Sequence, residues 1–297
     1  MRVFVTGATG FVGSAIVKDL IANGHEAIGL ARSDAAAASL AAAGASVHRG
    51  AIEDLDSLSA GAAMADGVIH TAFNNSDLSK FVESSEAERR AIETFGTVLA
   101  GTDRPLIVTA GLASLAQGRP GTEHDVRAPG ANISPRVSEV TAMTLAKRGV
   151  RASVVRLPCV HGDGDHYTIP MLIAIARKTG VSAYVGEGLN RWSAVHAVDA
   201  ANVYRLALEN GTAGIRYHAV AEDAVVFKDI AEVIGRRLGV PVVSRSPPEA
   251  TAHFGPFAVF AQADAPASSA LTREWLGWQP REATLLRDID RSNYYQT

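Results

Sequence analysis

The stretch Thr6-Gly7-Ala8-Thr9-Gly10-Phe11-Val12-Gly13 decides the fold of this protein. It follows a short apolar run, Arg2–Thr6, and opens a helical pattern over Phe11–Ala22. In such a stretch the first glycine permits a tight turn, the second lets the backbone approach a pyrophosphate, and the third lets helix and strand pack closely. The N-terminus of the helix then attracts the anion. Because the three glycines stand between a strand and a helix, the stretch predicts a dinucleotide-binding site.

Strand and helix patterns alternate along the first half of the chain. The runs Glu26–Leu30, Gly67–Thr71 and Pro105–Ala110 predict strands, and helical patterns stand between them. This alternation indicates right-handed βαβ units and a parallel sheet with helices on both faces. We therefore expect an α/β protein whose doubly wound sheet forms a nucleotide-binding core over residues 1–160. Residues 161–297 should form mainly a smaller α+β substrate lobe, with some segments returning to the core.

Two later segments are predicted to be irregular. Val160–Thr168 is rich in Gly, Asp and His and predicts a loop before a helix. Ser246–Pro266 contains several prolines and aromatic residues, and predicts an exposed, mobile flap.

Composition excludes several classes of function. The 297 residues include 28 Lys and Arg against 31 Asp and Glu, with a net charge of -3, which gives no electrostatic footprint for nucleic acid or an anionic membrane. The single cysteine, Cys159, excludes an intramolecular disulfide and a thiolate zinc cluster. The apolar runs fall short of the ~20 residues that span a bilayer, and the N-terminus lacks a signal-peptide pattern. We expect a cytoplasmic protein that binds a small molecule.

The spacing TGxxGxxG resembles that of the short-chain dehydrogenase/reductase superfamily, in its extended and atypical branches, which include NAD-dependent epimerases and dehydratases. Gly67–Ala72 (GVIHTA) resembles the fourth-strand motif that lies along the cofactor. Arg156–Gly162 (RLPCVHG) resembles the R-P-x-x-V-Y-G segment, and Trp192–Asp199 (WSAVHAVD) the V-H-V-x-D segment that ties the lobe to the core. The resemblance implies a Rossmann fold that binds NAD(H) or NADP(H), with substrate held between core and lobe. It is compatible with a homodimer, although no apolar helix face identifies an interface.

The end of the second predicted strand indicates the cofactor. An acidic residue there binds the ribose 2′-hydroxyl, whereas arginine favours a 2′-phosphate. Arg32 and Ser33 stand at this position, and Asp34 comes late and suits a helix cap. The prediction is NADP(H), with NAD(H) as the alternative. The residues predicted to contact the cofactor are Gly7, Thr9, Gly10, Phe11, Val12, Gly13, Arg32, Ser33, Ile52, Thr71, Ala72, Thr109 and Pro158.

The usual proton donor of the superfamily is missing. Its reductases use a tyrosine whose phenol is acidified by a lysine four residues later. This chain has six tyrosines, none before residue 167 and none followed by lysine at that spacing. Counting back from Arg156, the tyrosine position falls near Ala131 and the lysine position near Pro135.

Four residues are predicted as substitutes in the active site. Ser114 lies in the loop after the fifth strand, where a solvated serine is the alternative, and Ser138 stands on the helix after the empty positions. His161 and Tyr167 bound a polar loop expected to face substrate, with His166 as a further donor in it. Although the loop holds two histidines and two aspartates, its spacing lacks the helical arrangement of a zinc site, so no metal is expected. His70 and His196 are expected to be hydrogen-bonded packing residues.

Three functions follow as hypotheses. The first is an atypical reductase that uses NADPH on a carbonyl or related substrate, since the hydride comes from the cofactor and general acid catalysis contributes only ~10²–10⁴-fold. The second is a non-catalytic sensor or scaffold of NmrA-like type, which the missing tyrosine and lysine favour. The third is a nucleotide-sugar epimerase or dehydratase, which normally needs the same tyrosine.

Overall fold

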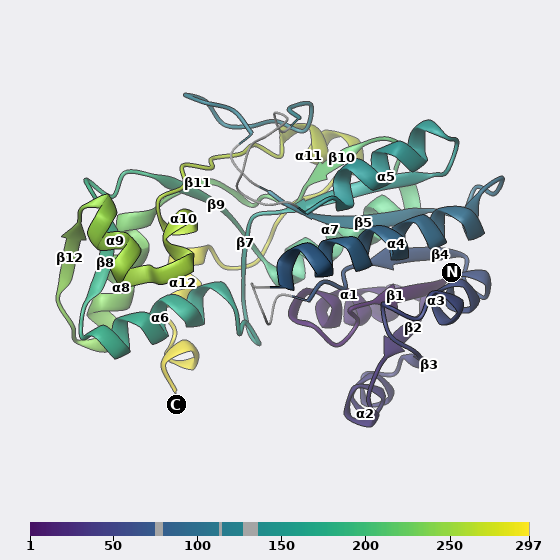
Figure 1. Cartoon of the computed structure of the whole chain (residues 1–297), viewed down its shortest axis with the longest axis horizontal. Helices are drawn as coiled ribbons and strands as arrows, with labels where there is room; N and C mark the ends of the chain where they lie inside the picture. The colour runs from purple at the N-terminus through teal and green to yellow at the C-terminus, as the bar shows by residue number, and fades with distance from the viewer. Residues whose placement is uncertain (75–79, 113–114, 127–135, 297) are drawn as a thin grey trace.

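A seven-stranded parallel sheet forms the core of the molecule (Figure 1). The computed structural model describes residues 1–74, 80–112, 115–126 and 136–296. The strand order is β3-β2-β1-β4-β5-β6-β10, which reverses direction at β1 as a doubly wound sheet does. This confirms the predicted Rossmann architecture. The strands are β1 (Arg2–Thr6), β2 (Glu26–Ala31), β3 (Ser46–Arg49), β4 (Gly67–His70), β5 (Leu106–Gly111), β6 (Ala152–Leu157) and β10 (Arg216–His218).

Helices cover both faces of this sheet because its strands carry apolar side chains in both directions. Val3 and Val5 of β1 pack into one buried cluster, and Phe4 between them packs into the other. The first cluster is covered by α1 (Phe11–Ala22), α2 (Asp34–Ala42) and α7 (Ala197–Asn210). The second is covered by α3 (Leu55–Ala63), α4 (Phe81–Leu99) and α5 (Ser138–Lys147). Among the described helices, none is long and apolar enough to cross a membrane.

The smaller lobe lies beyond the carboxyl ends of the core strands, at the left of Figure 1. It holds a three-stranded sheet, a parallel pair of strands and a third buried cluster between them. Its strands are β7 (Cys159–His161), β9 (Arg191–His196), β11 (Glu222–Val226), β8 (Ser182–Val185) and β12 (Val242–Arg245). Its helices are α6 (Thr168–Thr179), α8 (Phe227–Leu238), α9 (Pro247–Phe254), η2 (Gly255–Phe257), α10 (Ala258–Ala261), α12 (Leu285–Ile289) and η3 (Ser292–Tyr295), and α11 (Ala270–Leu276) packs beside β10 and α7.

The two predictions of irregular structure have different outcomes. The loop predicted over Val160–Thr168 is present between β7, which ends at His161, and α6, which starts at Thr168; only its first two residues differ, because they belong to β7 and pair with β9 in parallel. The prediction of an exposed, mobile flap is wrong. The expected flap forms α9, η2 and α10, and its residues Phe254 and Phe257 are buried in the lobe. A capping box between Ser246 and Glu249 starts α9, so the prolines here open helices.

Candidate cofactor and active site

The turn after β1 folds tightly against the end of β4. Gly7 has φ +69°, and a Cβ built on it would lie 2.5 Å from Oγ1 of Thr71 and 2.7 Å from the amide nitrogen of Ala72. A Cβ on Gly13 would lie 2.0 Å from the carbonyl oxygen of Gly7. Both glycines are therefore required by backbone contact, and the predicted cofactor residues Thr71 and Ala72 do lie beside the turn.

The N-terminus of α1 is open to an anion. Its N-cap residue, Gly10, provides no side-chain hydrogen bond, and the first turn holds no acidic residue. Within the described residues, the backbone N–H groups of Phe11, Val12 and Gly13 donate no hydrogen bond. Unsatisfied donors at the positive end of a helix are what a pyrophosphate requires. The residues present therefore fit a dinucleotide cofactor.

The end of β2 presents a basic side chain. Arg32 is exposed, and within the described residues its guanidinium makes no hydrogen bond or ion pair. Ser33, rather than Asp34, caps α2 by accepting a hydrogen bond of 3.2 Å from the amide of Ala36. Asp34 instead accepts a hydrogen bond of 2.5 Å from Arg49. Asp34 and Arg49 thus form an exposed ion pair. Ile52 lies partly exposed on the segment that follows β3.

A hydrogen-bonded layer lies beneath the site. Oγ1 of Thr109 donates to the carbonyl oxygen of His70 over 2.9 Å and lies 2.8 Å from the hydroxyl of Tyr204. Nδ1 of His70 lies 2.7 Å from Oγ1 of Thr6. Burial, together with the charge of Arg136, lowers the pKa of His70 to about 3, so this imidazole stays neutral. His70 is the packing residue that was predicted, and the hydroxyl of Thr109, which was predicted to contact the cofactor, is buried and engaged by His70 and Tyr204.

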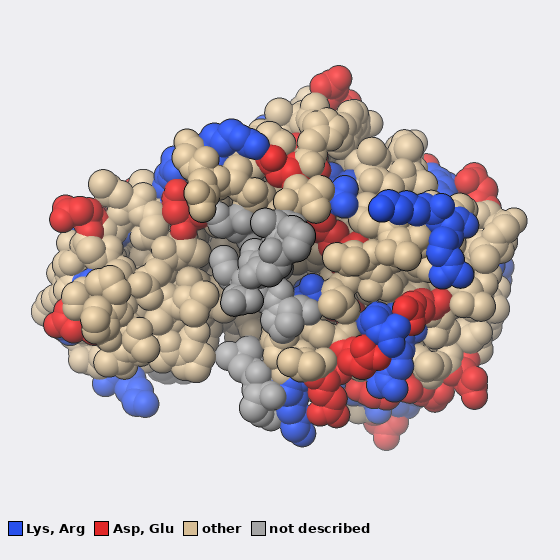
Figure 2. All heavy atoms as spheres, turned by 45° about the horizontal axis from the view of Figure 1, so that its top comes forward, with Lys and Arg blue, Asp and Glu red and all other residues tan. Residues whose placement is uncertain are grey.

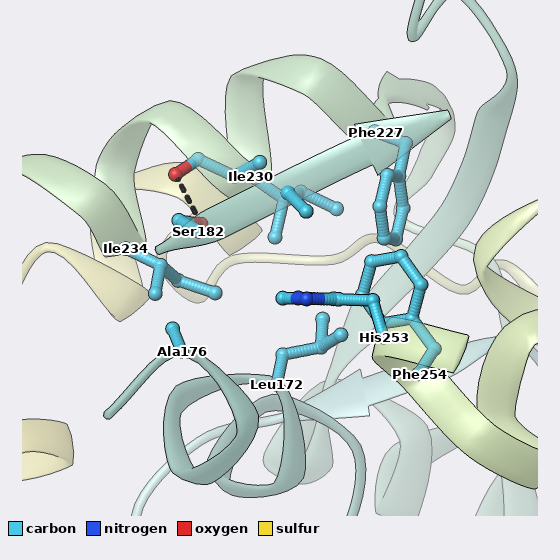
Figure 3. Close-up of a pocket in the computed structure, with 10 residues that line it drawn as sticks. Leu172, Ala176, Ser182, Phe227, Ile230, Ile234, His253 and Phe254 are labelled. Carbon is cyan, nitrogen blue, oxygen red and sulfur yellow. Dashed lines mark hydrogen bonds between the residues drawn. The ribbon is translucent and has the colours of Figure 1, made fainter. Parts of the chain in front are cut away.

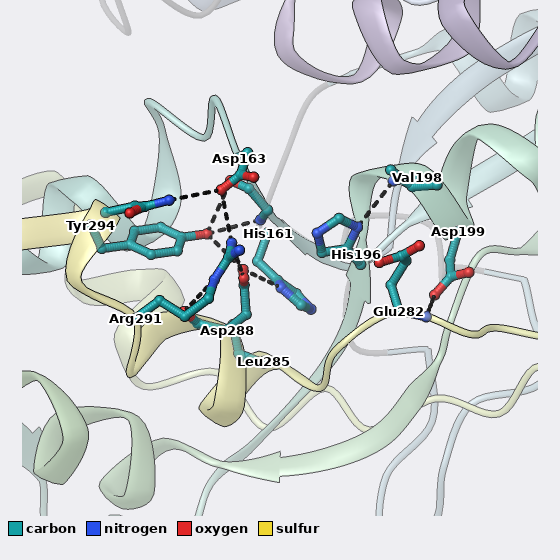
Figure 4. Close-up of polar contacts among 12 residues, drawn as sticks. His161, Asp163, His196, Val198, Asp199, Glu282, Leu285, Asp288, Arg291 and Tyr294 are labelled. Atoms are coloured by element: carbon teal, nitrogen blue, oxygen red, sulfur yellow. Dashed lines mark hydrogen bonds and ion pairs between the residues drawn. The ribbon is translucent and has the colours of Figure 1, made fainter.

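His161 does not face a substrate, contrary to prediction. It is fully buried, and its Nδ1 lies 2.9 Å from a carboxylate oxygen of Asp288 on α12 (Figure 4). Tyr294 closes the same cluster, because its hydroxyl lies 3.0 Å from the Asp288 carboxylate and accepts a hydrogen bond from the amide of Gly162. The guanidinium of Arg291 forms an ion pair with the Asp288 carboxylate and is the fourth member of this cluster. The reason for the error is that the partners of His161 come from the far end of the chain.

The other predicted catalytic residues have different surroundings. Ser114 lies outside the described residues. Ser138 is the first residue of α5 and is buried, which leaves it poor access to a substrate. Tyr167 precedes α6 and is 43% exposed. The neighbouring ring of His166 packs edge-on against Phe11 with centroids 6.3 Å apart, so this loop lies against the start of α1. Of the described candidates, Tyr167 and His166 are both exposed on this loop beside the cofactor-binding turn.

An ion pair near the site was missed from the sequence. Glu88 of α4 is fully buried, and its carboxylate accepts hydrogen bonds from Nε and Nη2 of Arg136 over 3.0 Å and 2.5 Å. The guanidinium carbon of Arg136 lies 4.3 Å from the centroid of the Phe73 ring. Arg136 adjoins Pro135, the expected lysine position, and that adjacency was the available signal.

The cofactor-binding turn is distinct from the small cavity in the lobe. That cavity is lined by apolar side chains that include Leu172, Phe227, Ile230 and Phe254 (Figure 3). Its volume of about 10 Å³ admits about one water molecule and no substrate. On the face shown in Figure 2, basic and acidic side chains are interspersed among the described residues.

Comparisons with known proteins agree with this geometry. The model of the NAD dependent epimerase/dehydratase family matches residues 3–99. An uncharacterized protein of Schizosaccharomyces pombe is 51% identical over 297 residues, covering 99% of this chain and 100% of that protein. A 4-hydroxy-2-methyl-3-oxo-4-farnesyl-3,4-dihydroquinoline-1-oxide ketoreductase of Stigmatella aurantiaca is 28% identical over 287 residues, covering 90% of this chain and 84% of that protein.

Among solved structures, a nucleoside-diphosphate-sugar epimerase of Pseudomonas aeruginosa has a TM-score of 0.78 at 21% identity, covering 97% of this chain and 95% of that chain. This likeness shows the shared fold. The glycine turn and the doubly wound sheet agree with the family model, and a relative is 51% identical over its whole length. The chain therefore belongs to the NAD-dependent epimerase/dehydratase family of the short-chain dehydrogenases/reductases.

Proposed function

We propose that this protein is an NADPH-dependent reductase of a carbonyl or related unsaturated small molecule, with Tyr167 as the proton donor. The observation that carries the proposal is the exposed phenol of Tyr167, because the residue before it, His166, packs against Phe11 at the cofactor-binding turn. The lobe thus supplies a tyrosine to a core whose sequence has none at the usual position.

The preference for NADPH rests on the end of β2. Arg32 is an exposed cation immediately after that strand, and guanidinium pairs well with a phosphate. Asp34, the nearby acid that would favour a ribose hydroxyl, is paired with Arg49. Both observations support binding of a 2′-phosphate over binding of the unmodified ribose.

Reduction of a carbonyl requires a hydride at carbon and a proton at oxygen. The reduced nicotinamide supplies the hydride when it is bound. Burial raises the pKa of Tyr167 above its ordinary value despite the opposing charge of Arg136, so the phenol is protonated at neutral pH. Tyr167 can therefore donate a proton to the oxygen that becomes a hydroxyl, and its exposure lets solvent replace that proton.

A named relative supports this reaction class. The Stigmatella aurantiaca protein, which aligns with most of this chain, is described as a ketoreductase. The nucleotide-sugar enzyme among the structural neighbours shares the fold at 21% identity, which carries no conclusion about substrate.

The test measures NADPH binding and turnover separately. Purified protein is titrated with NADPH and NADH by fluorescence, and NADPH oxidation is then followed with a panel of aldehydes, ketones and enones. We expect tighter binding of NADPH and turnover of at least one compound, reduced about 10²-fold or more in Tyr167→Phe. The sensor hypothesis predicts tight NADPH binding with no turnover of any compound. That result, or full activity of Tyr167→Phe, would contradict the proposal.

A further inference from the structure

The loop between β7 and α6, residues 162–167, is contacted from two sides. On one side lies the cofactor-binding turn, because the ring of His166 packs edge-on against Phe11 with centroids 6.3 Å apart. A Cβ built on Gly164 of this loop would lie 3.9 Å from Cδ2 of Phe11. On the other side lies the C-terminal segment, residues 288–296, which includes η3. The loop therefore stands between the first helix of the core and the end of the chain.

The C-terminal segment contacts the loop mainly through the hydroxyl of Tyr294. This hydroxyl accepts a hydrogen bond of 2.8 Å from the amide of Gly162 and lies 3.2 Å from the carbonyl oxygen of the same residue. It also lies 3.0 Å from the buried carboxylate of Asp288 (Figure 4). A second contact, from Arg291 to the exposed carboxylate of Asp163, adds little because such surface pairs are weak.

The backbone of Gly162 depends on this hydroxyl. Gly162 is buried, with φ +132° and no room for a side chain beside His196. In the part of the chain that the structure describes, Tyr294 provides the one acceptor for its N–H group. A buried donor without an acceptor is costly. Loss of the hydroxyl should therefore let this amide move toward water, and the loop should move with it.

Phe11 connects the loop to the phosphate-binding site. Its N–H group is one of the free donors at the start of α1, and its ring is the one that contacts His166. A pyrophosphate bound at these donors would fix the backbone of Phe11, and with it the ring against which the loop packs. When two events each order the same group, each favours the other, and the coupling is reciprocal.

We propose that Tyr294 is a positioning residue that holds the loop against the cofactor-binding turn and so couples order in the C-terminal segment to nucleotide binding. A bound nucleotide slows the opening of residues 288–296, and a defect at Tyr294 weakens nucleotide binding. The proposal rests on the cofactor-binding part of the proposed function, and it does not depend on which residue donates the proton.

The first experiment follows amide hydrogen exchange in the whole protein with and without saturating NADPH, or NADH if that binds more tightly. We expect the nucleotide to slow exchange at residues 6–13, in the loop, and also over residues 288–296 on the far side of the loop. The control is β12, which pairs only with β8 among the described strands and should exchange at the same rate in both states. Protection of the turn with no change over residues 288–296 would overturn the proposal.

The second experiment compares two neighbouring tyrosines. We expect Tyr294→Phe to raise the Kd for NADPH about tenfold and to abolish the effect of NADPH on exchange over residues 288–296. Tyr295→Phe is the matched control, because among the described residues its hydroxyl makes no hydrogen bond and its ring keeps its contact with Arg237. It should bind NADPH as the wild type does.

A double-mutant cycle tests the connection through Phe11. Phe11→Leu keeps the N–H group that would bind phosphate but removes the ring that contacts His166. We expect Tyr294→Phe to raise the Kd about tenfold in the wild type and little in the Phe11→Leu background. Additive effects on the Kd would contradict coupling through the loop.

The outcomes separate the two proposals. A wild-type Kd in Tyr294→Phe would overturn the role of Tyr294 alone, whereas a fully active Tyr167→Phe would overturn the proton donor and leave the role of Tyr294 standing. Failure to bind either nucleotide would overturn both. Thermal unfolding is measured for every variant, and Asp288→Asn, which keeps the hydroxyl of Tyr294 on Gly162, controls for lost stability without loss of that contact.

Discussion

Nδ1 of His161 lies 2.9 Å from a carboxylate oxygen of Asp288, and this contact ties β7 to a helix 127 residues further along the chain. Both side chains are almost fully buried. The histidine therefore holds the C-terminal segment against the lobe. Gly162 beside it leaves no room for a side chain, since a Cβ there would lie 2.7 Å from Nε2 of His196.

Replacing Asp288 by Asn should destabilise the protein without weakening cofactor binding. The change replaces a buried carboxylate by a neutral amide, which weakens the contact with His161 and removes the anionic partner of Arg291, a loss of about 1–3 kcal/mol in the free energy of unfolding. Chemical denaturation and NADPH titration measure the two quantities. Asp163→Asn, which changes an exposed partner of Arg291, is the control and should have little effect on stability. Equal stability of Asp288→Asn and wild type would contradict this role.

The stabilisation by Asp288 should depend on pH in the acid range. Burial raises its pKa, but the hydrogen bond and charge of His161, then Tyr294 and Arg291, hold the pKa below its ordinary value of 3.8. A carboxyl with a depressed pKa stabilises the folded state above that ordinary value, and the contribution is lost as pH falls through the folded-state pKa. The difference in stability between wild type and Asp288→Asn should thus be constant near neutrality and shrink below pH 3.8. A difference in stability between the two proteins that grows as the pH falls would contradict this prediction.

Gly13→Ala should destabilise the protein more than Gly10→Ala does. A Cβ on Gly13 would lie 2.0 Å from the Gly7 carbonyl oxygen, whereas one on Gly10 would lie 3.2 Å from it. Gly13→Ala must therefore move α1 from the sheet, which costs about 1–3 kcal/mol and should abolish measurable NADPH binding. Gly10→Ala should fold normally and bind NADPH more weakly, because the methyl group stands where the backbone approaches phosphate. Thermal unfolding with and without NADPH checks both. Comparable destabilisation by the two variants would argue against this geometry.

Replacing Arg32 by Ser should change the cofactor preference. The variant loses the exposed cation at the end of β2, so its Kd for NADPH should rise about tenfold while its Kd for NADH changes little. Fluorescence titration at low and moderate salt measures both constants. Arg2→Ser, at the opposite end of the sheet and paired with Asp66, controls for net charge. Parallel weakening of NADPH and NADH would assign Arg32 to a contact that both cofactors share.

The sequence by itself determined the core and the cofactor-binding turn. Glycine spacing, apolar runs and their alternation are local properties, and backbone sterics convert them directly into a turn, a helix and a buried strand. The helix over Phe11–Ala22 has the predicted bounds for this reason.

Only the tertiary structure decided which polar side chains remain available for chemistry. His161 is removed from the site by Asp288, Thr109 is held by Tyr204 from 95 residues away, and Arg136 is placed by Glu88 from 48 residues away. The sequence pattern around such polar residues does not predict which distant residues they will contact. Whether a histidine, threonine or arginine is buried, bound or exposed is settled by packing between distant segments, so the same letters in the sequence fit a catalytic and a structural role equally well.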